Sequence, residues 1–223
     1  MTRASRFSFL AVVAIAAAGT THASGQEAET QKGIALAELA TLAGVIVLAQ
    51  VRDTDYVYRR EFPVAGSAFL RVLIPYKASQ PMDIIEVYEA GLHAHECYFP
   101  TPTVFEEGRR YLLFLQEDAE KPGRYRGLPQ GCALDILVAQ DNSYVLRLPV
   151  TGIELTDSLD VYRQSFEFSD SYAVETDESL NPQQREALMA GAWIMPRGME
   201  YLYTSGVSLS VVRQLMRTGN QHQ

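Results

Sequence analysis

The sequence predicts a mainly β protein: a small antiparallel barrel of five or six strands, with one helix before it and a helical extension after it. Short apolar runs rich in β-branched residues recur at hairpin spacing between positions 45 and 148. Glycine and proline punctuate these runs, which fits an all-β barrel better than alternating βαβ units. A hydrophobic fraction of 47% over 223 residues is enough for a proper core.

Residues 1–23 have the pattern of a secretory signal peptide. Arg3 and Arg6 precede an apolar run over residues 7–18, and small residues lead up to Ala23. The run is shorter than the roughly 20 apolar residues that a membrane span needs. We therefore expect cleavage near Ala23 and an exported protein, periplasmic or secreted, with no membrane span.

The acidic balance of the chain limits its partners. The formal net charge is −8, and removal of the predicted signal peptide, which holds two arginines and no acid, takes it to −10. Such a charge repels phosphate backbones and anionic lipid surfaces. We expect a protein or a small molecule as the partner, and no nucleic acid.

The predicted elements follow from local patterns. Apolar residues at helical spacing predict a helix over residues 34–42, which Gly44 ends. The β-branched run 45–51 predicts a buried strand whose charged continuation leaves the core. Further strands are predicted over residues 69–76, 83–88, 111–116, 134–139 and 144–148, with a weaker one over residues 125–127.

The composition changes after the last of these strands. Residues 152–181 hold eight acids and one base, which predicts an acidic linker. Asn181, with Gln184 three positions later, predicts a capped helix over residues 182–190, and a second amphipathic helix is predicted over residues 208–218. The predicted divisions are a signal peptide (1–23), a barrel domain (34–150) and an acidic linker with a helical extension (151–223).

The two cysteines of the chain are Cys97 and Cys132. A pair of cysteines in an exported chain most often forms one disulfide. The two cysteines bracket a loop of about 35 residues. Closing such a loop suggests a stabilisation of about 3–4 kcal/mol by chain entropy. Free thiols and metal ligation are the alternatives.

A metal site is one such alternative. On an extended chain, His93, His95 and Cys97 project from the same face, because side chains alternate with a period of two. Two imidazoles and a thiolate suit zinc or copper, with Cys132 as a fourth ligand. In the other interpretation the cysteine is bridged and the histidines are exposed.

The basic residues concentrate in one region. Arg109 and Arg110, with Arg124 and Arg126 beyond a predicted turn, would form a patch for a carboxylate or a phosphate if their strands pair. The alternative, which we favour, is that they form ion pairs with neighbouring acids. These acids are Glu106, Glu107, Glu117 and Glu120.

The sequence offers no catalytic constellation. Nucleophile elbow, zincin, P-loop and C-x-x-C patterns do not occur. We therefore predict neither an enzyme nor a cofactor.

Several segments together resemble a known family. The strand GVIVLAQV (44–51), the strand FLRVLIPYK (69–77) and the segment EEGRRYLLFL (106–115), with a cysteine on each side of the last, resemble bacterial exported domains related to tissue-inhibitor-of-metalloproteinases and netrin modules. The resemblance implies an OB-fold barrel over residues 34–150. The inhibitors act through a cysteine at the mature N-terminus, whereas Cys97 is the first cysteine here.

These observations lead to three functional hypotheses. The first is an exported, non-enzymatic binding module stabilised by one disulfide. The second is a zinc- or copper-binding protein centred on His93, His95 and Cys97. The third is an inhibitor of exported proteases.

Overall fold

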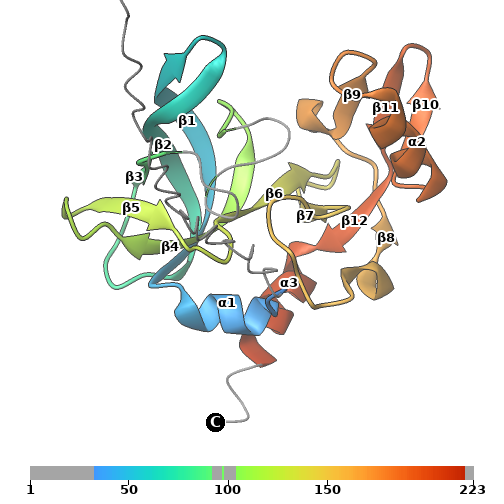
Figure 1. Ribbon diagram of the computed structural model, residues 1–223. Coiled ribbons are helices and arrows are strands. Elements are labelled where there is room, and N and C mark those ends of the chain that lie inside the picture. The colour runs from blue at the N-terminus through green and yellow to red at the C-terminus, as the bar shows by residue number, and fades with distance from the viewer. Residues whose placement is uncertain (1–32, 92–96, 98–103, 219–223) are drawn as a thin grey trace, which may run out of the picture. The chain divides into compact units, whose positions relative to one another are not determined.

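The computed structural model describes residues 33–91, 97 and 104–218. Over these residues the protein is mainly β, as predicted (Figure 1). The first part holds α1 (Leu36–Leu42), β1 (Val45–Arg59), β2 (Phe62–Lys77), β3 (Ile84–Glu89), β4 (Arg110–Glu117), β5 (Arg124–Gly127), β6 (Ala133–Val138) and β7 (Tyr144–Arg147). The predicted helix and strands up to residue 148 are thus present. β1 and β2 extend well beyond the predicted ranges 45–51 and 69–76, and the ends of the other elements differ by a few residues.

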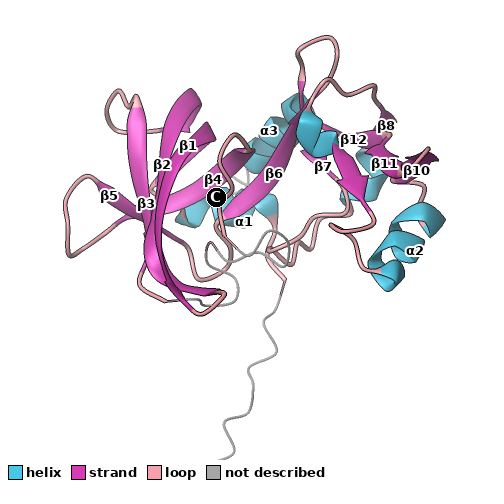
Figure 2. Cartoon of the chain, turned by 90° about the horizontal axis from the view of Figure 1, so that it is seen from above, coloured by secondary structure: helices cyan, strands magenta, loops and turns pink. Residues whose placement is uncertain are grey.

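Five strands close into a ring of hydrogen-bonded pairs. β1 pairs with β2, β2 with β3, β3 with β5, β5 with β4, and β4 returns to β1 (Figure 2). Four of these pairs are antiparallel, and the β3–β5 pair is parallel. The prediction of a wholly antiparallel barrel is therefore wrong in one pair. The reason is geometric, because strand direction cannot alternate all the way around a ring of five.

The ring is part of a larger mixed sheet of nine strands, so a small separate barrel is too simple a description. Residues 115–117 of β4 pair with β5 and residues 110–113 pair with β6, while β1 lies along residues 110–115. β5 and β6 therefore share one edge of β4. From β6 the sheet continues through β7, β12 and β8.

β1 shows why the apolar run at its start is continuous. Val45, Val47 and Ala49 belong to the apolar cluster inside the ring. Ile46 and Leu48 belong to a second cluster outside the ring, which includes residues of α1 and α3. Both faces of this first half of the strand are buried, so its side chains are apolar on both sides.

The sequence did not predict the first half of β2. Pro63 and Gly66 are strand breakers, and the predicted strand began at Phe69. Gly66 has a φ of 148°, and a β-carbon there would lie 2.3 Å from the carbonyl oxygen of Asp55. The glycine is required where the two hairpin strands approach closely, so the same residue that signals a break is needed inside the strand.

The C-terminal part is more than a helical extension. Its predicted helices are present as α2 (Pro182–Ala190) and α3 (Leu209–Thr218), and Asn181 and Gln184 form the predicted capping box. It also contains two 3-10 turns and five short strands: η1 (Leu159–Tyr162), β8 (Gln164–Ser165), η2 (Ser171–Ala173), β9 (Val174–Thr176), β10 (Ile194–Arg197), β11 (Glu200–Tyr203) and β12 (Ser205–Ser208).

The short strands belong to two different sheets. β12 joins the large sheet between β7 and β8, whereas β9, β10 and β11 form a separate three-stranded sheet. Strands of two to four residues carry too little periodicity to be recognised locally. Their pairing with distant strands decides their structure.

Candidate functional site

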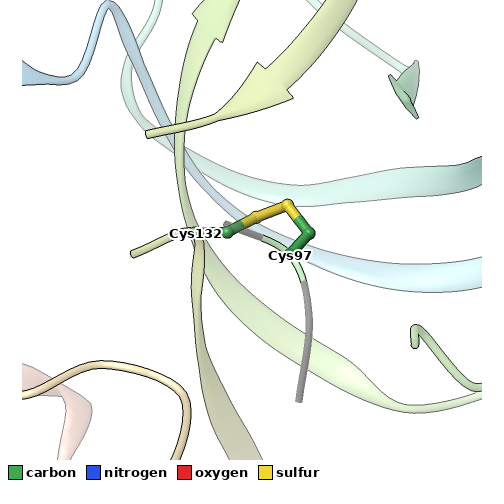
Figure 3. Close-up of a disulfide and its surroundings, with 2 residues drawn as sticks. All are labelled: Cys97 and Cys132. Carbon is green, nitrogen blue, oxygen red and sulfur yellow. A yellow bond between two sulfur atoms is a disulfide. The ribbon is translucent and has the colours of Figure 1, made fainter. Parts of the chain in front are cut away.

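The predicted disulfide between Cys97 and Cys132 is confirmed (Figure 3). The two α-carbons lie 4.9 Å apart, and both cysteines are fully buried in the cluster inside the ring. Cys132 lies just before β6, so the bridge ties the loop that precedes β4 to the start of β6. Both sulfurs are engaged, so neither supplies a thiolate to the predicted metal site.

The histidines of that metal site, His93 and His95, lie outside the described residues. Within the described part of the chain, no group of three or more His, Cys, Asp or Glu side chains is arranged to hold a metal ion.

The four predicted arginines do not form one patch. β4 and β5 do pair, with Arg126 opposite Gln116, but Arg110 lies at the other end of β4, opposite Ile136 of β6. Three of the four have acidic partners. Arg110 contacts Asp170 at 3.0 Å, Arg124 contacts Asp118 at 2.5 Å, and Arg109 contacts Glu106 at 2.6 Å. Of the acids named from the sequence, Glu106 pairs with Arg109 and Glu120 lies 3.7 Å from Arg124.

Arg109 also belongs to a buried network that links the two sheets. Its Nη1 donates to Oδ2 of Asp135 on β6 at 3.0 Å, and the same oxygen lies 3.2 Å from Nη1 of Arg147 on β7. Arg147 then reaches Oε1 of Glu175 on β9 at 3.4 Å. Charges therefore alternate along Arg109, Asp135, Arg147 and Glu175, which we call the Arg147 network.

The network is electrostatically balanced. Burial alone would lower the pKa of Arg147, but the negative charge of Asp135, together with Tyr203 and Glu175, raises it. The Arg147 guanidinium also lies 5.0 Å from the centre of the Tyr203 ring. Burial raises the pKa of Tyr203 to about 12, so its hydroxyl group stays protonated at neutral pH.

One end of the Arg147 network opens into a cavity of about 200 Å³ between β7, α2 and the three-stranded sheet. We call it the Trp193 pocket. Its apolar walls include Leu180, Ala187, Leu188 and Trp193, and its charged wall is formed by Arg147 and Glu175. An apolar cavity with a few convergent polar groups is the usual form of a small-molecule site.

Trp193 is held in this wall by its backbone. Its N–H donates to the Leu188 carbonyl at 3.1 Å, and its carbonyl accepts from the Thr204 N–H at 3.0 Å. Gly191 gives the indole room, because a β-carbon there would lie 2.4 Å from the ring. The indole Nε1 is itself buried and has no hydrogen-bond partner among the described residues.

Sequence reasoning did not identify this site. Arg147 lies in the predicted strand 144–148, and Glu175 lies in the predicted acidic linker. The local signals were the one tryptophan of the chain and the glycine two residues before it. Neither signal says that Arg147 and Glu175 lie beside them.

Comparisons with known proteins do not classify the chain: no protein-family model, no curated protein and no solved structure matches it. In the described part of the chain, no helix has the length and apolar character needed to cross a membrane.

Proposed function

We propose that this protein is an exported, non-enzymatic binding module that holds a small amphipathic ligand in the Trp193 pocket. The observation that carries the proposal is the cavity itself. It combines about 200 Å³ of largely apolar space with a buried ion pair. By comparison, an apolar protein cavity of about 150 Å³ is large enough to bind benzene.

An OB-like barrel is the proposed scaffold. The order of pairs around the ring, β1-β2-β3-β5-β4, and its one parallel pair support this assignment. The OB-fold is a five-stranded barrel used widely for binding. The resemblance to inhibitor and netrin modules noted from the sequence fits the same scaffold, and it enters here as part of the proposal.

Export is supported by the signal-peptide pattern of residues 1–23 and by the disulfide, which is typical of oxidising compartments. The proposed mature protein begins near Ser24 and acts in the periplasm or outside the cell.

Binding is proposed over catalysis because of how the charged groups are engaged. Arg147 and Glu175 neutralise each other across 3.4 Å, and Glu175 also accepts a hydrogen bond from the Ser179 hydroxyl at 2.7 Å. Charged groups that are held in place by an ion pair and a hydrogen bond are well suited to orient a ligand. A general base, by contrast, must be free to take up a proton near neutral pH.

The proposal is tested with the mature chain and a panel of benzene-sized compounds: toluene, benzyl alcohol, phenylacetate, phenethylamine and L-phenylalanine. Trp193 is the only tryptophan in the chain, so its fluorescence reports directly on the pocket. We expect at least one compound to change this fluorescence saturably and to raise the midpoint of thermal unfolding.

A matched pair of variants locates the binding. Ala187 and Ala190 are both exposed on α2, and only Ala187 lines the pocket. Ala187→Phe should fill the cavity and abolish binding, whereas Ala190→Phe should leave it unchanged. The proposal fails if no compound binds, or if Ala187→Phe binds as well as Ala190→Phe.

A further inference from the structure

The charged wall of the Trp193 pocket presents two opposite charges side by side. Nη1 of Arg147 lies 3.4 Å from Oε1 of Glu175, and the two side chains are only 9% and 8% exposed. Both residues line the cavity. Burying such a pair costs desolvation energy, which a pair of apolar residues would avoid. The wall of the apolar cavity therefore offers both a positive and a negative charge to a ligand.

Each charged group keeps capacity for a ligand. The ion contacts of Arg147 with Asp135 and Glu175 both involve Nη1, and a guanidinium has further N–H donors on Nε and Nη2. Oε1 of Glu175 accepts a hydrogen bond from Arg147, and Oε2 accepts one from Ser179. A carboxylate has about four lone-pair sites, so Glu175 can accept further hydrogen bonds. An additional carboxylate at Arg147 and an ammonium group at Glu175 would continue the alternation of charges.

The charge balance selects against ligands with a single charge. A lone carboxylate or a lone ammonium group would bring an uncompensated charge into a site whose own charges are already paired, and this is unfavourable in an apolar environment. A ligand that carries both charges on adjacent atoms adds no net charge. It places each charge next to its opposite.

Size and wall chemistry define the rest of the ligand. Because a cavity of about 150 Å³ accepts benzene, about 200 Å³ accommodates a benzene-sized or branched aliphatic group with a few additional atoms. Leu180, Leu188 and Trp193 would surround that apolar group.

We infer that the Trp193 pocket binds a compact zwitterion with an apolar side chain, the chemistry of a free hydrophobic amino acid, with its carboxylate at Arg147 and its ammonium group at Glu175. This inference rests on the proposed function, because it names the ligand class of the same pocket.

The order of affinities within the panel tests the inference. L-phenylalanine should bind at least ten times more tightly than phenylacetate, which lacks the ammonium group, and than phenethylamine, which lacks the carboxylate. Toluene tests the pocket without either charge. If toluene, phenylacetate or phenethylamine binds as tightly as L-phenylalanine, the inference is overturned while the proposed function stands. If nothing binds, both are overturned.

A charge variant tests the role assigned to Glu175. Glu175→Gln keeps the shape of the side chain and removes its charge, so L-phenylalanine should lose at least tenfold in affinity and its advantage over phenylacetate should disappear. Glu178→Gln is the matched control, because Glu178 is exposed nearby and does not line the pocket. A preference for L-phenylalanine that survives in Glu175→Gln would overturn the assignment. Should that variant not fold, the panel on the unmodified chain still decides.

Discussion

Gly127 lies directly against Cys97: a β-carbon added at Gly127 would lie 2.9 Å from the Cys97 sulfur and 2.8 Å from the Cys132 β-carbon. Gly127 ends β5, so the disulfide packs onto a strand of the ring that contains neither cysteine. The bridge and the absence of a side chain at position 127 are therefore parts of one packing arrangement inside the ring.

Gly127→Ala should destabilise the protein by about 1–3 kcal/mol, because the disulfide has no room to yield in a filled core. Gly44→Ala is the matched control. A β-carbon there meets nothing nearer than 3.7 Å, so its effect should stay within about 0.5 kcal/mol. Urea unfolding of both variants measures the difference. Equal stability of the two would show that the ring adjusts freely around the disulfide.

Removing the disulfide should cost about 3–4 kcal/mol of unfolding free energy, since the bridge closes a loop with a sequence separation of 35. The measurement is equilibrium unfolding of the double variant Cys97→Ala/Cys132→Ala against the oxidised protein. Reduced wild-type protein serves as the second comparison and should unfold close to the double variant. A loss below about 1 kcal/mol would mean that the strand pairing alone holds the ring.

Asp135→Asn should be among the more damaging polar substitutions. Its Oδ2 lies 3.0 Å from Arg109 and 3.2 Å from Arg147, and neither arginine side chain is more than 10% exposed. Removing a charge from a buried pair costs about 3 kcal/mol or more, because the remaining charge loses its compensation. Thermal or urea unfolding reports this loss.

Asp160→Asn is the corresponding control at the surface. Asp160 is 65% exposed and lies 3.7 Å from Arg163, so its loss should cost less than about 1 kcal/mol. If Asp135→Asn were no worse than Asp160→Asn, the Arg147 network would contribute little to the junction between the two sheets.

Asp118 should make stability depend on pH. It accepts the backbone N–H of Glu120 at 3.0 Å and Nε of Arg124 at 2.5 Å, and these interactions hold the pKa of Asp118 below its ordinary value. A carboxyl group whose pKa is lowered by folding stabilises the protein above its unfolded-state pKa of about 3.9. That stabilisation is lost as the pH falls through the lower pKa of the folded state.

Unfolding midpoints from pH 6 to pH 2 test this for the wild type and for Asp118→Asn. The wild type should be more stable at pH 6, and the difference should shrink as the solution becomes more acidic. If the difference in stability between the wild type and Asp118→Asn stayed constant over this range, Asp118 would not be the source of the pH dependence.

The sequence carried most of the information on local structure. The continuous apolar run of β1, the alternation in later strands and the capping pair of Asn181 and Gln184 each depend on neighbours within a few residues. Gly66 and the short strands after residue 163 were not predicted. Their conformation depends on partner strands, such as the neighbouring hairpin strand with Asp55 for Gly66 and the distant β7 for β12.

In the candidate site, too, features that depend on neighbouring residues were predictable and those that depend on strand pairing were not. The cysteine pairing was predictable because there is only one way to join two cysteines. For the four arginines the sequence left two options, a patch or ion pairs with neighbouring acids, and favoured the pairs. Strand register separates the four and gives three of them acidic partners, two of which, Asp118 and Asp170, were not among the acids named. Arg147, Glu175 and Trp193 show no common pattern, because nothing local marks side chains that meet across two sheets.

By itself the sequence determined a mainly β chain with a helix before its first strand, one disulfide, and a capped helix and an amphipathic helix near its end. These features follow from the period of apolar residues and from the chemistry of neighbouring residues. Only the tertiary structure decided that five strands close into a ring with one parallel pair, and that residues 147, 175 and 193 enclose one pocket. Register and sheet closure bring them together, and both depend on hydrogen bonds between segments that are distant in the chain.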